Sequence, residues 1–91
     1  MNESNKIPNG WSESLQKRIG RNIRAKRQSD GMTIYQLAAK TGISWHTIDL
    51  METGQRIPRL DTILWFCKQS GWKLSEIIGD RPKTSGREET P

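Results

Sequence analysis

The 91-residue sequence contains one cysteine, one histidine and no long apolar run, and each shortage excludes a class of protein. The single cysteine, Cys67, excludes an intramolecular disulfide and, with one histidine, leaves no set of zinc ligands. No apolar segment approaches the ~18 residues that cross a bilayer, and the polar start has no signal-peptide core. We therefore expect a soluble, cytoplasmic protein that needs no membrane, metal or cofactor.

Catalytic groups are equally scarce, whereas basic residues are plentiful. The sequence has no clustered carboxylates and no glycine-rich phosphate-binding loop, so we expect that the protein is not an enzyme. Fifteen Lys and Arg against ten Asp and Glu give a formal net charge of +5. This surplus favours polyanionic partners, with nucleic acid first, although a surplus that serves only solubility would look the same.

Polar segments flank a central region of helical periodicity. Residues 1–10 are polar and contain Pro8 and Gly10, so they predict a flexible arm. Residues 79–91 carry no large apolar side chain and predict a disordered tail. Between them, residues 11–78 predict one compact all-α domain of five helices, because no stretch alternates with the period of a strand.

Capping residues and glycines divide this region into its five predicted helices. Ser12, Thr33 and Ser44 are suitable N-caps, and glycines stand where the helices should end. Counted with their caps, the predicted helices cover residues 12–29, 33–41, 44–53, 60–70 and 75–78. In the first of them, apolar residues recur every fourth position and mark the stripe that should face the core: Leu15, Ile19 and Ile23.

The second and third predicted helices have the features of a helix-turn-helix. They are joined at Gly42, a residue type that tolerates positive φ in a tight turn. The small Ala38-Ala39 pair allows two helices to cross closely. Ile48 and Met51 would hold the third helix against the body, which leaves its other face free to enter a major groove.

Several segments, in this order, resemble the phage lambda repressor and Cro-like helix-turn-helix family, also called the XRE family. They are IGRNIRAKR, GMT, LAAKTGIS, an E-x-G-x-R-x-P run and the closing GWKLSEII, between Ile19 and Ile78. The resemblance implies a bacterial or phage regulator that binds double-stranded DNA. We expect a repressor that acts as a homodimer on a pseudo-palindromic operator.

The third predicted helix should carry the contacts to base edges. With Ile48 and Met51 facing inward, His46 and Leu50 point most directly outward. By resemblance, the base-contacting residues are Ser44, Trp45, His46 and Leu50. Two alternatives remain open, because Trp45 could cover the edge of the core and Leu50 could be a scattered surface residue.

Phosphate contacts should come from polar and basic residues around the groove. The expected set is Arg24, Arg27, Thr33, Lys40, Thr53, Arg56 and Arg59. The peptide N–H groups at the starts of the second and fourth helices are further anion sites. By resemblance, Arg27 should also form a salt bridge with Glu52.

Some residues differ from those that the family usually has, and the differences affect the expected contacts with DNA and with a protein partner. Ile34 stands where the family commonly has a phosphate-contacting glutamine, and isoleucine cannot donate a hydrogen bond. Trp72 should enter the core, whereas Trp65 indicates either a partner surface or a corner packed against Trp72. We expect Trp65 or Trp72 to lie near a partner surface formed by the fourth and fifth helices.

Two rival functions remain open. An antitoxin of the same fold would bind DNA and also neutralise a toxin protein, and an exposed Trp65 would favour it. An adaptor that has lost DNA binding would explain Ile34 and the unusual base-reading residues.

Overall fold

The computed structural model describes residues 8–79, and all regular structure in this part of the chain is helical. The helices are α1 (Trp11–Ser29), α2 (Ile34–Thr41), α3 (Trp45–Glu52), α4 (Leu60–Ser70) and α5 (Leu74–Ile78). The predicted all-α class is therefore confirmed. No helix within residues 8–79 is both long and apolar enough to span a bilayer. Most of the predicted arm (1–10) and tail (79–91) lies outside the described residues.

The start of α1 differs from the prediction. Its N-cap is Gly10, with φ of 81° and no side-chain cap, whereas Ser12 lies inside the first turn. The Trp11 N–H donates to the Pro8 carbonyl at 3.1 Å, so a backbone turn replaces the expected serine cap. At the other end, the Gly79 N–H bonds the Ser75 carbonyl at 2.9 Å and closes α5.

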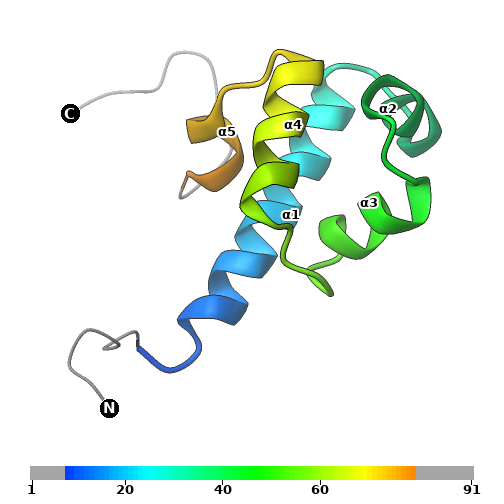
Figure 1. Cartoon of the computed structure of the whole chain (residues 1–91). Coiled ribbons are helices and arrows are strands. Elements are labelled where there is room, and N and C mark those ends of the chain that lie inside the picture. Colours follow the sequence, from blue (N-terminus) through cyan, green and yellow to red (C-terminus); the bar gives the residue numbers. More distant parts are fainter. Residues whose placement is uncertain (1–7, 80–91) are drawn as a thin grey trace.

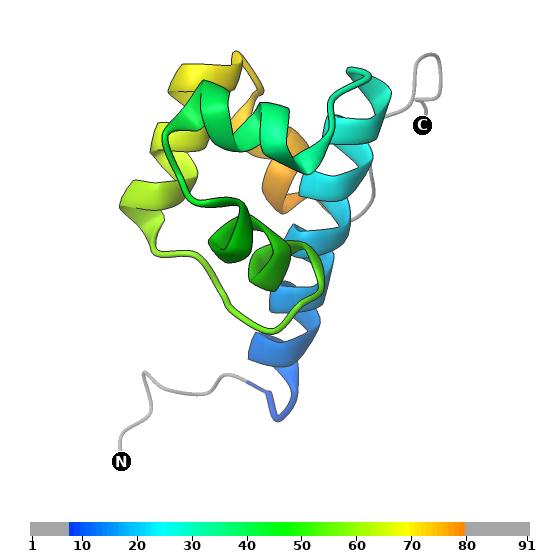
Figure 2. The same cartoon turned by 90° about the vertical axis from the view of Figure 1, so that its right-hand side faces the viewer.

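The long helix α1 is the support on which the domain assembles. It packs on α3 and on α5, while α2 contacts both α3 and α4. Figure 1 shows α2 and α3 on the opposite side of the molecule from α5, and Figure 2 shows α3 on the near side with α2 above it. The two-helix motif is therefore presented on one side of the domain.

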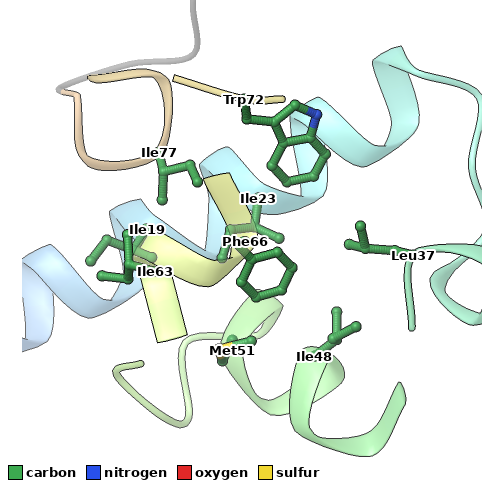
Figure 3. Packing of buried hydrophobic residues seen from close by; sticks show 9 residues of the cluster. All are labelled: Ile19, Ile23, Leu37, Ile48, Met51, Ile63, Phe66, Trp72 and Ile77. Atoms are coloured by element: carbon green, nitrogen blue, oxygen red, sulfur yellow. The ribbon is translucent and has the colours of Figure 1, made fainter. Parts of the chain in front are cut away.

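A single hydrophobic core joins the five helices around Phe66 (Figure 3). The ring of Phe66 is fully buried, and the indole of Trp72 stacks on it with centroids 6.2 Å apart. The stripe predicted for α1 faces this core, with Leu15 at its margin. The buried apolar residues are Ile19 and Ile23 of α1, Leu37 of α2, Ile48 and Met51 of α3, Ile63 and Phe66 of α4, Ile77 of α5, and Trp72.

A buried polar residue that the sequence analysis did not single out fastens α5. The Asn22 side-chain amide donates to the Ile77 carbonyl at 2.8 Å and to the Gly79 carbonyl at 3.0 Å. Beside it, the Glu76 carboxylate accepts the Lys73 N–H at 3.0 Å and pairs with Lys26 at 3.4 Å. The Lys73 N–H and the Lys26 ammonium hold the pKa of Glu76 below its usual value.

Helices α1 and α3 approach each other so closely that only glycine fits at position 20. A Cβ on Gly20 would lie 2.1 Å from the Met51 carbonyl oxygen and 2.8 Å from that of Glu52. Both atoms belong to the α3 backbone, which cannot move aside as a flexible side chain would. The missing side chain of Gly20 therefore sets the distance between α1 and α3.

Replacing Gly20 with alanine should destabilise the protein. Helix propensity alone would favour alanine by about 1 kcal/mol. The clash with the α3 backbone should instead lower the free energy of unfolding by about 1–3 kcal/mol or more, which urea denaturation would measure. Ser14→Ala, at an exposed position of the same helix, is the matched control and should change stability little. A stabilised Gly20→Ala variant would contradict the close approach.

Candidate nucleic-acid interface

Two capped helices joined by a left-handed glycine form the candidate interface. At the start of α2, the Thr33 hydroxyl accepts the Gln36 N–H at 3.0 Å, and the Gln36 side chain accepts the Thr33 N–H at 2.8 Å. Gly42, with φ of 78°, ends α2 and donates its N–H to the Ala38 carbonyl at 2.8 Å. Of the small pair, Ala38 packs against the core and Ala39 is exposed. These local bonds define a tight turn between α2 and α3.

Helix α3 places one face on the core and the other in solvent. Ile48 and Met51 are buried, as the sequence predicted, and Ile43 packs at the margin of the core. Trp45 and His46 are exposed on the outer side of the helix. Since both side chains are exposed, this outer side is accessible to a partner.

The prediction that Leu50 points most directly outward is only partly correct, because Leu50 is half-buried. After α3 the main chain turns back, and the Leu50 carbonyl accepts N–H groups from Gln55 at 2.9 Å and Arg56 at 3.2 Å. Periodicity within α3 could not reveal this loop. Part of the leucine side chain remains accessible.

A bidentate ion pair holds the carboxyl end of α3. Arg27 Nε and Nη2 donate to the two carboxylate oxygens of Glu52 at 2.7 and 3.0 Å, and Nη1 donates to the Met32 carbonyl at 2.9 Å. The side chains of Arg27 and Glu52 are only 12% and 3% exposed. Hydrogen bonding to Glu52 raises the pKa of Arg27 above its usual value.

The expected Arg27–Glu52 pair is therefore present in the structure. All three guanidinium nitrogens already bind protein oxygens in a largely buried position. The pair ties the end of α3 to α1. The phosphate contact expected of Arg27 stays a prediction.

The residues expected to contact bases lie together at the start of α3. The Ser44 hydroxyl accepts the Thr47 N–H at 3.1 Å and donates to the Thr47 hydroxyl at 2.9 Å. Ser44 is therefore engaged as a cap, although it is exposed. Trp45 and His46 follow it, with ring centroids 5.6 Å apart.

Tyr35 joins these rings and was missed by the sequence analysis. It is exposed in the first turn of α2, and its ring centroid lies 5.7 Å from that of Trp45. The two rings are tilted by 58°. The turn between α2 and α3 brings them together, so only the folded arrangement reveals the contact.

The basic residues expected to contact phosphate, apart from Arg27, are exposed. Within residues 8–79, Arg24, Lys40 and Arg56 are exposed and take part in no ion pair. Arg59 pairs with Asp61 at 3.3 Å, but both side chains are so exposed, at 84% and 69%, that water screens the interaction. All four side chains are therefore accessible to a DNA phosphate.

The two threonines of the expected phosphate-contacting set serve the helix ends. The Thr33 hydroxyl accepts an N–H in the capping box of α2, and the Thr53 hydroxyl donates to the Asp49 carbonyl at 2.8 Å. Both residues are exposed, so a phosphate could still approach them. Ile34 packs against the core and offers no donor where the family commonly has glutamine.

A hollow separates α3 from the start of α4. Its lining consists of Thr47, Met51, Arg56, Ile57, Pro58, Arg59 and Thr62. Arg59 is the N-cap of α4 and makes no side-chain capping bond, so the first peptide N–H groups of that helix have no such acceptor. Two arginines and open N–H groups favour an anion at this position.

The tryptophans expected at a partner surface have different environments. Trp72 is only 5% exposed, and its indole N–H donates to the Asp30 carboxylate at 2.8 Å, so it enters the core as the sequence predicted. Its expected position near a partner surface stays a prediction. Trp65 is exposed, and its N–H bonds the Thr41 carbonyl at 2.6 Å. It braces α2 instead of packing against Trp72. Elsewhere on α4, partial burial raises the pKa of the Cys67 thiol.

The sequence also matches the family model of the Cro/C1-type helix-turn-helix DNA-binding domain over residues 22–83. This match covers about two thirds of the 91-residue chain. No curated protein and no solved structure gives a significant match.

Breaking the buried pair should destabilise the domain. Glu52→Gln would leave the Arg27 charge without its partner and should lower the free energy of unfolding by about 3 kcal/mol. Asp61→Asn breaks the exposed pair with Arg59 and is the matched control, with little change expected. Urea denaturation of the two variants compares them directly. Equal, small effects would show that the Arg27–Glu52 pair contributes nothing to stability.

Proposed function

The chain belongs to the family of Cro/C1-type helix-turn-helix DNA-binding domains, and from this premise we propose that it represses transcription by occupying an operator. The family membership makes it a DNA-binding transcriptional regulator. Repression, dimerisation and a pseudo-palindromic operator are the parts that we propose. We further propose that it acts in the cytoplasm of a bacterium or an infected cell by binding alone, without a catalytic step.

The orientation of α3 is the observation that carries the proposal. Ile48, Met51 and Glu52 hold one side of this helix to the body, and the side that bears His46 and Trp45 is exposed. An exposed helix held rigidly by its other face is what insertion into a major groove requires. We propose that His46 and Trp45 meet base edges, with Ser44 at the helix start and the accessible part of Leu50 beside them.

We propose that exposed basic residues supply the part of the binding free energy that does not depend on the DNA sequence. We propose phosphate contacts for Arg24, Lys40, Arg56 and Arg59, with Thr33 and Thr53 as additional contacts through their exposed positions. The hollow at the start of α4 would receive one phosphate, because it combines Arg56 and Arg59 with open N–H groups.

A single α3 reads only a few base pairs, so a useful specificity ratio requires two half-sites. We propose a homodimer formed through α4 and α5. Leu60 and Leu64 lie one turn apart on α4 and are 67% and 49% exposed, and Leu74 and Ile78 of α5 are also exposed. An apolar helix surface of this kind suits a second copy of the chain. Trp65 would lie at its edge, whereas Trp72 stays in the core.

The same exposed leucines give one rival function its support. An antitoxin would use DNA binding as proposed and cover Leu60, Leu64 and Trp65 with a toxin protein. An adaptor without DNA binding draws support from Ile34, which offers no donor at the start of α2.

Substitutions at phosphate and base contacts should have different signatures. Arg56→Ala should weaken binding to all sequences alike and lower the slope of log affinity against log salt by about one. His46→Ala should instead relax preference at one position of each half-site, by about 1–3 kcal/mol against the best site. Titration of selected and random duplexes at several salt concentrations measures both effects.

A matched control for Arg56 is Lys68→Ala, which removes an exposed cation from the far end of α4. It should leave the salt slope unchanged. Binding that is weak, uniform across sequences and indifferent to His46 would favour the adaptor over the repressor.

Dimerisation should depend on the apolar side of α4. Leu64→Glu should shift the operator complex from two copies toward one, because a buried charge would oppose association. Ser14→Glu, which adds the same charge at an exposed position of α1, is the matched control and should leave the stoichiometry at two. Sedimentation with and without operator DNA measures the result. A one-to-one complex of the parent chain on a single half-site would contradict the dimer.

A further inference from the structure

The exposed side of α3 is poor in the groups that usually read bases. The helix WHTIDLME contains no Arg, Lys, Gln or Asn, the side chains that form bidentate hydrogen bonds with guanine or adenine. Its two hydroxyl neighbours, Ser44 and Thr47, are bonded to each other at 2.9 Å. Few hydrogen-bonding groups of this face are therefore free to recognise a sequence.

What the face offers instead is apolar surface held in a fixed position. Trp45 is 47% exposed, although its ring is in contact with Tyr35 on one side and His46 on another. Leu50 lies five residues, about 1.4 turns, further along α3 and is partly accessible. Ring contacts at centroid distances of 5.6 and 5.7 Å restrict the indole, so that little conformational freedom is lost when it meets a partner.

The major groove contains one apolar feature that distinguishes bases, the C5-methyl group of thymine. We propose that Trp45 and Leu50 recognise thymine methyl groups, and that Tyr35 is a positioning residue which orients Trp45. The inference rests on the proposed operator binding and names the chemistry that the operator must present. Lys40 and Arg56, both exposed, provide the charge complementarity that brings a duplex to this face.

The test removes only the methyl groups. The full chain selects its site from random-sequence duplex DNA, and the selected duplex is then prepared with deoxyuridine in place of each thymidine in turn. Uracil keeps every hydrogen-bonding group of thymine and lacks the methyl. Each substitution at a contacted position should weaken binding about fourfold, the value of burying one such group, whereas substitutions outside the half-sites should have no effect.

Protein variants test whether Trp45 and Leu50 cause the preference for thymine over uracil. In Trp45→Ala or Leu50→Ala, the ratio of thymine to uracil affinity should fall to about one at the position that each residue contacts. Trp11→Ala is the matched control, because Trp11 is equally exposed, at 46%, but lies on α1. This variant should keep the full ratio. Tyr35→Phe should keep it as well, while Tyr35→Ala should reduce it, since the ring and not the hydroxyl contacts Trp45.

Three outcomes would overturn the inference, and they are distinguishable. Equal affinity for the thymine and uracil duplexes would show that no methyl group is read. If both Trp45→Ala and Leu50→Ala kept the full ratio of thymine to uracil affinity, the methyl group would act through the shape of the DNA and not through these side chains. Failure to select any sequence would overturn the proposed operator binding itself, and this inference with it.

Discussion

The crossing of α1 and α3 is the contact on which the rest of the structure depends. Gln16, Gly20 and Arg27 are spaced so that they fall on one side of α1. Gln16 donates to the Gly54 carbonyl beyond the end of α3, Gly20 admits the α3 backbone, and Arg27 binds Glu52. One helix face thus sets the distance, the axial position and the angle of the other helix.

This dependence follows from the length of α3. A helix of eight residues is far below the ~12–15 residues at which isolated helices become even marginally stable. Its persistence and its orientation therefore come from tertiary packing. The docking side, with Ile48, Met51 and Glu52, is separate from the side that bears Trp45 and His46. The residues on the exposed side of α3 can therefore differ from those usual in the family without changing how α3 packs on the rest of the domain.

Polar contacts accompany the apolar core at several junctions between helices. Asn22 joins α1 to the end of α5, Glu52 joins α3 to α1, and the Trp65 indole joins α4 to the end of α2. Hydrophobic burial is not directional, whereas each of these bonds requires one relative position. They therefore select a single arrangement of helices that apolar contacts alone would specify less sharply.

The sequence by itself determined the helices, the turn and most of the core. A capping bond or a glycine turn involves neighbours a few residues apart, so Thr33, Gly42 and Ser44 were readable locally. Tertiary structure alone decided what depends on distant residues. It left Leu50 half-buried and brought Tyr35 to Trp45. Periodicity states which way a side chain faces, but not what the folded chain places opposite it.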